Sequence, residues 1–347
     1  MTTISGATVK SDFSHDSVNL AIIGTGLMGR HHLRVILENF PLTSIPVVCE
    51  PALDAFDEAA QLFVDAGRPV PDNEPALDTM LAIHGDRLDA VFLITPHALH
   101  HDQTVACLEA DLDVLLEKPM VMDEGEARSL IQVRDESKRL LVVAFNGTLS
   151  PEIRKAATML KSGELGEILS ISATIWQDWR QLTAGTWRQE PDISGGGFLF
   201  DTGAHMLNTV SDLAGADFTE IAAWFDNRGT AVEINGVAIG RLTSGALVSL
   251  HGSGETIPSC DSKILVFCSE GILRTGAWGG FLEVQRAGDS DFTPVEVPST
   301  NGVWEQFLAI RKGKLPNPAP PEVGLRLARL YGALVESAET DGRVVRL

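Results

Sequence analysis

Lys118 is the first residue whose type and position could do chemistry. It ends a buried apolar run in the order Glu117-Lys118-Pro119. An ammonium group at the carboxyl end of a strand, where ligands gather in an open α/β sheet, can donate to a substrate hydroxyl or exchange a proton. A structural ion pair with Glu117 or another carboxylate explains the lysine equally well. The residue is therefore a candidate for either role.

Asp201 and His205 form a second candidate pair, four residues apart in the segment GGGFLFDTGAH at 195–205. The spacing predicts a helix that starts near Phe198 or Asp201 and carries both side chains on one face. Histidine is the usual general base near neutral pH, and a neighbouring carboxylate adjusts its readiness to take a proton. Alternatively, Asp201 caps the helix and His205 is a packed polar residue. A zinc site lacks a third ligand at metal spacing, so we expect no metal.

Three glycines, Gly24, Gly26 and Gly29, lie in the sequence GTGLMG between an apolar run and a helical pattern. At these positions glycine permits a tight turn, the approach of a pyrophosphate to the backbone, and close packing of helix on strand. A strand before the motif and a helix after it are the context that a dinucleotide site requires. A tight turn without a ligand is the alternative.

Glu50 ends the second apolar run, where a carboxylate can accept hydrogen bonds from a ribose diol. Its charge would repel a 2′-phosphate, and no arginine follows it immediately. The sequence therefore favours NAD over NADP.

The elements that position these residues change character along the chain. Nearly continuous apolar runs alternate with helical patterns up to residue 146, and they lie at 18–24, 45–50, 88–95, 113–119 and 140–146. This βαβ repetition predicts an α/β domain with a doubly wound parallel sheet.

Beyond residue 150 the pattern predicts an α+β domain. A helix at 151–163, ending at Gly163, precedes seven strand-like runs with short turns between them. We expect an open, mostly antiparallel sheet there. A Pro-rich hinge at 316–323 leads to a last amphipathic helix at 324–340.

The predicted organisation has four parts. A flexible N-terminal segment covers 1–17 and the dinucleotide-binding domain 18–147. The substrate and oligomerisation domain covers 148–315, and the hinge with the last helix, packing back on both domains, covers 316–347.

Composition limits the partners. The chain has 347 residues and a net charge of −20, which disfavours nucleic acid and anionic membranes. The first 17 residues have no apolar core of a signal peptide, and no stretch of about 18 apolar residues occurs. We expect a cytoplasmic protein whose four cysteines are reduced core residues.

The motifs together resemble the glucose-fructose oxidoreductase/inositol dehydrogenase/MocA-like (Gfo/Idh/MocA) family of oxidoreductases. The resemblance rests on GTGLMG, TPHALH at 95–100, LLEKP at 115–119, KSGELGEI at 161–168 and GGGFLFDTGAH, in this order over nearly the whole chain. It implies an N-terminal Rossmann fold and a C-terminal open antiparallel sheet. That sheet carries the substrate pocket and commonly mediates a homo-oligomer, here a dimer or tetramer.

The resemblance also implies roles for individual residues. Lys118 and His205 would be the catalytic pair, and Asp201 would orient His205 or bind substrate. The substrate would contact Lys118, Trp176, Arg188, Asp201 and His205. The cofactor would contact Gly24, Gly26, Leu27, Met28, Gly29, Glu50, Thr95, Pro96, His97, His100, Glu117, Lys118, Asn146, Trp187 and Arg188. A structural role for His100 is as plausible as a functional one, and Trp176 and Trp179 could equally be core or interface residues.

One departure concerns Gly147, which follows Asn146 where many relatives have arginine. The substrate is therefore the least certain part of the resemblance. The leading hypothesis is an NAD-dependent dehydrogenase acting on a secondary alcohol of a sugar, cyclitol or related polyol, in carbohydrate metabolism. One alternative is a redox-neutral NAD-dependent enzyme that cleaves glycosides, and another is a non-catalytic NAD- or sugar-sensing regulatory protein.

Overall fold

The computed structural model describes residues 17–347, so the predicted flexible segment lies, except for Ser17, outside the described residues. The first domain is built on a six-stranded sheet with the order β3-β2-β1-β4-β5-β6. All its pairs are parallel, as the apolar runs predicted. The strands are β1 (Val18–Ile23), β2 (Thr43–Cys49), β3 (Asp72–Asn73), β4 (Ala90–Leu93), β5 (Asp113–Leu116) and β6 (Leu141–Val143).

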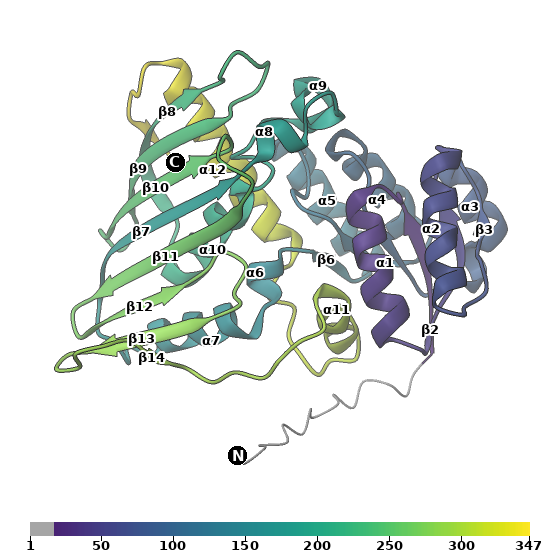
Figure 1. Cartoon of the computed structure of the whole chain (residues 1–347), viewed down its shortest axis with the longest axis horizontal. Helices are drawn as coiled ribbons and strands as arrows, with labels where there is room; N and C mark the ends of the chain where they lie inside the picture. Colours follow the sequence, from purple (N-terminus) through teal and green to yellow (C-terminus); the bar gives the residue numbers. More distant parts are fainter. Residues whose placement is uncertain (1–16) are drawn as a thin grey trace.

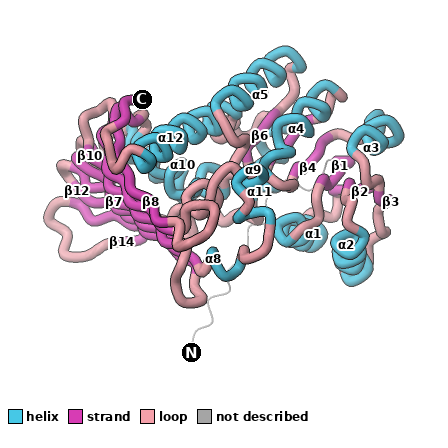
Figure 2. Tube along the Cα trace, turned by 90° about the horizontal axis from the view of Figure 1, so that it is seen from above, coloured by secondary structure: helices cyan, strands magenta, loops and turns pink. Residues whose placement is uncertain are grey.

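Helices cover both faces of this sheet, because successive side chains of each strand point to opposite sides. Ala21 and Ile23 of β1 belong to one core cluster, and Leu20 and Ile22 belong to another. Figure 2 shows α1 and α2 below the sheet and α4 and α5 above it. The helices are α1 (Leu27–Asn39), α2 (Leu53–Asp65), α3 (Leu77–His84), α4 (His100–Glu109) and α5 (Glu124–Ser137).

The second domain contains a nine-stranded sheet with the order β14-β13-β12-β11-β7-β10-β9-β8-β15. One pair, β7 with β10, is parallel and the others are antiparallel, which confirms the mostly antiparallel prediction. The strands are β7 (Ile168–Gln177), β8 (Phe218–Asp226), β9 (Asn235–Leu242), β10 (Leu247–Ser253), β11 (Cys260–Cys268), β12 (Gly271–Thr275), β13 (Leu282–Arg286), β14 (Thr293–Pro294) and β15 (Val345–Arg346).

Longer helices of the second half gather on one face of this sheet, and the other face is left open (Figures 1 and 2). They are α7 (Pro151–Lys161), α10 (Gly203–Ala214) and α12 (Pro321–Glu339). Shorter helices are α6 (Asn146–Leu149), α8 (Trp179–Leu182) and α9 (Pro191–Ser194), with single 3₁₀ turns at Gly85–Arg87, His97–Leu99 and Trp187–Gln189. Gly163 has the positive φ of +75° expected after α7.

The chain returns to the first domain before it ends. Helix α11 (Val303–Arg311) packs in the core of the parallel sheet, and the indole N–H of Trp304 donates to Thr43 Oγ1 at 3.0 Å. The expected boundaries had placed this helix in the second domain. Its docking depends on contacts with residues more than 250 positions away, which local sequence patterns do not reveal.

Cys49, Cys107 and Cys268 are buried free thiols, but Cys260 is exposed at the start of β11. The expectation that all four cysteines are core residues is therefore wrong for Cys260. Among residues 17–347, no helix is long and apolar enough to cross a membrane.

Candidate active site

The glycine turn is shaped by steric contacts at two positions and left open at the third. A Cβ on Gly24 would lie 2.6 Å from the carbonyl oxygen of Ile94, and one on Gly29 would lie 2.3 Å from that of Gly24. A Cβ on Gly26 would meet nothing within 4 Å. No side chain caps the N-terminus of α1, which begins at Leu27. Free N–H groups beside an open glycine fit a phosphate.

A cavity of about 430 Å³ begins at this turn, at the carboxyl edge of the parallel sheet, and it extends to Trp187, Arg188 and Asp201 of the second domain. Most of the predicted cofactor residues line it together with Asp201. They are Gly24, Gly26, Leu27, Met28, Glu50, Thr95, Pro96, His97, Glu117, Lys118, Trp187 and Arg188. Gly29, His100, Asn146, Trp176 and His205 are not among the lining residues. The cavity thus joins the glycine turn to Lys118 and Asp201.

Glu50 lines the cavity at the end of β2, where its carboxylate braces the glycine turn. Its Oε2 accepts from the backbone N–H of Thr25 at 2.7 Å and from Thr25 Oγ1 at 3.1 Å, and its Oε1 accepts from the N–H of Ala52 at 2.9 Å. A carboxylate has about four lone-pair sites, so the remaining capacity suits a ribose hydroxyl. Recognition of the ribose by Glu50 remains a prediction.

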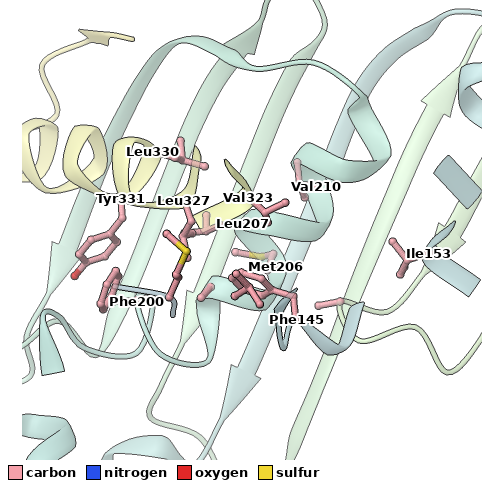
Figure 3. Packing of buried hydrophobic residues seen from close by; sticks show 14 of the residues in the cluster. Phe145, Ile153, Phe200, Met206, Leu207, Val210, Val323, Leu327, Leu330 and Tyr331 are labelled. Carbon is pink, nitrogen blue, oxygen red and sulfur yellow. The ribbon is translucent and has the colours of Figure 1, made fainter. Parts of the chain in front are cut away.

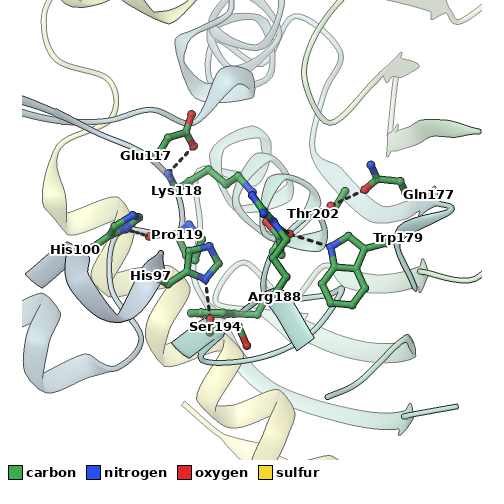
Figure 4. Close-up of polar contacts among 12 residues, drawn as sticks. His97, His100, Glu117, Lys118, Pro119, Gln177, Trp179, Arg188, Ser194 and Thr202 are labelled. Atoms are coloured by element: carbon green, nitrogen blue, oxygen red, sulfur yellow. Dashed lines mark hydrogen bonds and ion pairs between the residues drawn. The ribbon is translucent and has the colours of Figure 1, made fainter. Parts of the chain in front are cut away.

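Asp201 gathers donors from three segments of the chain. Lys118 Nζ lies 2.8 Å from Asp201 Oδ1, while Trp179 Nε1 and Arg188 Nε lie 2.9 and 3.2 Å from Oδ2. Figure 4 shows Lys118, Arg188 and Trp179 converging on this point. The neighbouring cations Lys118 and Arg188 overcome the effect of burial and hold the pKa of Asp201 well below its usual range. Lys118 is thus both part of an ion pair and exposed to the cavity.

The predicted helix carrying both Asp201 and His205 is wrong at its start. Helix α10 begins at Gly203, and Asp201 lies in the turn before it. The carboxylate is therefore directed to Lys118, and no hydrogen bond joins it to His205 among the described residues. The three glycines at 195–197 and Phe198 hold the chain in a turn, so the helix begins only at Gly203.

His205 is buried and its Nδ1 has no hydrogen-bond partner in the part of the chain that the structure describes. The rings of Phe145 and Trp278 lie 6.2 and 5.6 Å from its ring, centroid to centroid. Burial, reinforced by the charge of Lys118, lowers the pKa of His205 to about 3. The imidazole is therefore neutral at pH 7, next to an ammonium group.

The Glu117 carboxylate is hydrogen-bonded to the backbone of Lys118. Its Oε2 accepts from the backbone N–H of Lys118 at 2.9 Å, and its Oε1 lies 2.7 Å from His32 Nε2. Although burial opposes ionisation, the His32 hydrogen bond and the nearby positive charges lower the pKa of Glu117 to about 2. His32 was missed at the sequence level, although it follows the glycine motif by one turn of α1.

The two histidines of the TPHALH segment have different positions. His97 lines the cavity, and its Nδ1 lies 2.7 Å from the carbonyl oxygen of Ser194. Burial lowers the pKa of His97 to about 3. His100 is fully buried, and its Nδ1 lies 2.9 Å from the carbonyl oxygen of Pro119 (Figure 4). Its Nε2 lies 2.9 Å from the carbonyl oxygen of Thr95. His100 thus connects two segments that line the cavity.

The tryptophans predicted near the site lie in different places in the structure. Trp187 lies against His97, at 4.7 Å between ring centroids, and the Arg188 guanidinium lies 4.5 Å from the Trp187 ring. Trp176 is on the partly exposed face of β7, opposite the buried Ile171, Ala173 and Ile175. The pleat turns Trp176 away from the α10 side of the sheet, and Trp176 does not line the cavity, so its contact with substrate remains a prediction. Trp179 is buried instead, and its indole N–H donates to Asp201.

Sequence reasoning also missed Glu233, a buried carboxylate before β9. Nothing in the spacing of its neighbours sets it apart.

Among residues 17–347, no group of three or more His, Cys, Asp or Glu side chains could hold a metal ion.

Two family descriptions match the chain, one for each domain. Residues 18–145 match "Oxidoreductase family, NAD-binding Rossmann fold", and residues 153–274 match "GFO/IDH/MocA C-terminal domain". Together they cover most of the sequence and divide it where the two sheets do.

Similar proteins of known activity include two dehydrogenases. The scyllo-inositol 2-dehydrogenase (NADP(+)) IolW of Bacillus subtilis strain 168 is 24% identical over 93% of this chain and 94% of its own length. The levoglucosan dehydrogenase of Pseudarthrobacter phenanthrenivorans is 27% identical over 60% of this chain, and the match spans about half, 53%, of that enzyme.

Solved structures share the fold. A levoglucosan dehydrogenase in complex with NADH and levoglucosan superposes with a TM-score of 0.81 at 23% identity, covering 96% of this chain and 99% of that one. An aldose-aldose oxidoreductase from Caulobacter crescentus, complexed with glycerol, gives a TM-score of 0.79 at 18% identity, covering 95% of this chain and 100% of that one.

Proposed function

This chain belongs to the Gfo/Idh/MocA family of oxidoreductases, and we propose that it is an NAD-dependent dehydrogenase acting on a secondary alcohol of a sugar, cyclitol or related polyol. One observation carries the proposal. Lys118, paired with Asp201, lines the same cavity as the open glycine turn and lies within electrostatic reach of the neutral His205. The turn that would bind a phosphate and a group that would transfer a proton thus line one cavity.

The cofactor fits the residues present. The uncapped start of α1 and the open position at Gly26 would hold the pyrophosphate, and Glu50 would hold the ribose. When bound, a nicotinamide supplies the hydride acceptor. NADP is the less favoured cofactor, because the Glu50 carboxylate would repel a 2′-phosphate.

The protein's own groups handle the proton. Lys118 would donate a hydrogen bond to the substrate oxygen, and Asp201 keeps the ammonium in place. The neutral imidazole of His205, whose Nδ1 has no hydrogen-bond partner among the described residues, would accept the hydroxyl proton as hydride leaves the carbon that bears the hydroxyl. Since the charge of Lys118 acts on His205, the two groups would share the transfer of the proton.

The test is absorbance at 340 nm with purified protein, NAD or NADP, and a panel of inositols, aldoses, amino sugars, sugar acids and glycosides. We expect NADH to form with one polyol class. Released aglycone is measured in the same reactions. Aglycone without net NADH would replace the proposal with redox-neutral glycoside cleavage, and tight NAD binding without turnover on the panel would favour a sensor.

We also propose that the open face of the second sheet joins copies of this chain. Ile239 and Leu247 are 60% and 53% exposed there, and a groove runs between β7, β8, β9 and β10. A contiguous apolar patch on a sheet face marks an interaction site. A second copy would cover it with an identical face, as expected for a two-fold interface.

A further inference from the structure

Glu233 is a buried carboxylate outside the cavity, and its oxygens are occupied by backbone donors. Its Oε2 accepts from the N–H of Gly197 at 2.7 Å, and its Oε1 accepts from those of Leu199 and Phe200 at 3.1 and 3.3 Å. These donors belong to the turn before α10. A single carboxyl group thus accepts from N–H groups that no regular element pairs.

The backbone at Glu233 holds the same turn. The N–H of Phe198 donates to the carbonyl oxygen of Glu233 at 2.8 Å. A Cβ on Gly197 would lie 2.0 Å from that oxygen, so only glycine permits the approach. Gly197 therefore serves the contact with Glu233.

Tyr331 of α12 completes the arrangement. Its hydroxyl hydrogen-bonds the Glu233 carboxylate, and burial beside that charge raises its pKa well above the usual value. Its ring packs on Phe200 with centroids 4.5 Å apart (Figure 3). A Cβ on Gly196 would lie 2.2 Å from the tyrosine oxygen. The last helix thereby fixes the turn from the other side.

The turn held in this way positions Asp201 for its contact with Lys118. The N–H of Asp201 donates to the carbonyl oxygen of Gly197 at 2.9 Å, and that of Gly203 donates to Phe198 at 2.7 Å. Asp201 in turn meets Lys118 at 2.8 Å. We propose that Glu233 is a positioning residue whose carboxylate fixes the 197–200 turn so that Asp201 holds Lys118. The proposal rests on the proposed function only for what the Lys118–Asp201 pair does.

The variant Glu233→Gln tests this, because an amide keeps the size but presents N–H groups to backbone donors. Glu305→Gln is the matched control. Glu305 is also buried and accepts from the N–H of Asn301 at 2.6 Å, but its helix α11 contacts Asp113 and Asp89, at the amino-terminal edge of the parallel sheet, through Arg311. Both variants lose a buried carboxylate, and only one of them is near Asp201.

Two readouts separate positioning from stability. In Glu233→Gln we expect kcat with the best polyol to fall by about tenfold or more, with the Kd of NADH within about twofold of wild type. Acetylation of Lys118 by acetic anhydride, followed by mass spectrometry, should be about fivefold faster, since a Lys118 side chain that no longer donates to Asp201 is more accessible to the reagent. Glu305→Gln should lower the unfolding midpoint alone.

Wild-type kcat and wild-type Lys118 labelling in folded Glu233→Gln would overturn the proposal. If that variant does not fold, Tyr331→Phe removes one donor from the carboxylate and should give faster Lys118 labelling, and wild-type labelling would overturn the proposal instead. The labelling needs no substrate. A wild-type protein that oxidises no polyol would therefore contradict the proposed function and leave this test in force.

Discussion

At the scale of single residues, the site depends on charges kept in a space with little water. Asp201 is 6% exposed, and its ionised form is maintained by Lys118, Arg188 and the Trp179 indole. Removing one partner of a buried pair costs about 3–5 kcal/mol when the remaining charge is left alone. Here Arg188 remains beside Asp201 when Lys118 is replaced, so a folded Lys118 variant is expected.

The buried histidines should make stability fall in acid. His97 and His205 have folded-state pKa values lowered to about 3, below the ordinary 6.5 of the unfolded chain. Their contribution is fully present above pH 6.5 and is lost as pH falls toward 3, because unfolding then takes up protons. In His205→Gln the slope of unfolding free energy against pH, measured by urea titrations between pH 6 and 5, should decrease by about 1.4 kcal/mol per pH unit. An unchanged slope would show that His205 titrates normally.

Glu50 should determine the choice of dinucleotide. In Glu50→Ser the repulsion of a 2′-phosphate is lost, together with the brace on Thr25. We expect NAD to bind about tenfold more weakly and the preference for NAD over NADP, measured as the ratio of kcat/KM values, to decrease. Retained selectivity would show that Glu50 does not contact the ribose.

At the scale of elements, substitutions in the glycine turn should affect stability and NADH binding separately. In Gly26→Ala the added Cβ meets nothing within 4 Å, so the unfolding midpoint should stay near wild type while NADH affinity falls by about tenfold or more. In Gly29→Ala the Cβ lies 2.3 Å from the carbonyl oxygen of Gly24, and the midpoint itself should fall. Thermal unfolding and fluorescence titration measure both. Equal NADH affinity in Gly26→Ala and wild type would contradict the pyrophosphate site.

Element types were predictable where local pattern and tertiary burial agree. The parallel strands are continuous apolar runs, and the end of α7 just before Gly163 follows from glycine geometry. The start of α10 was not predictable in this way. Its residues have helical spacing from Phe198, but the Glu233 carboxylate takes the N–H groups of the preceding turn. A remote partner thus overrides local propensity.

At the scale of the whole molecule, self-association through the open sheet face is testable. Ile239→Glu puts a charge in the centre of the exposed apolar face of β9, and we expect a smaller species by light scattering with an unchanged unfolding profile of the monomer. Ile83→Glu, on the exposed side of α3, is the control and should keep the assembly. An Ile239→Glu protein of wild-type mass would place the interface elsewhere.

The candidate site was partly predictable, because its motifs end strands that meet at one edge of the sheet. Lys118 and the glycine turn could be placed together from topology alone. The contacts of Trp179 with Asp201 and of Trp304 with Thr43 could not, since they join segments whose proximity only the assembled domains create. The side of β7 on which Trp176 lies could not be predicted either, because it depends on which face of the sheet the helices cover.

The central claim, that Lys118 and His205 move the proton during hydride transfer, is tested most directly by turnover in Lys118→Ala and His205→Ala. NADH formation at 340 nm is measured with the active polyol beside the Kd of NADH for each variant. The account predicts that kcat falls by about 100-fold or more in both while the Kd changes little. Wild-type kcat in both folded variants would contradict it.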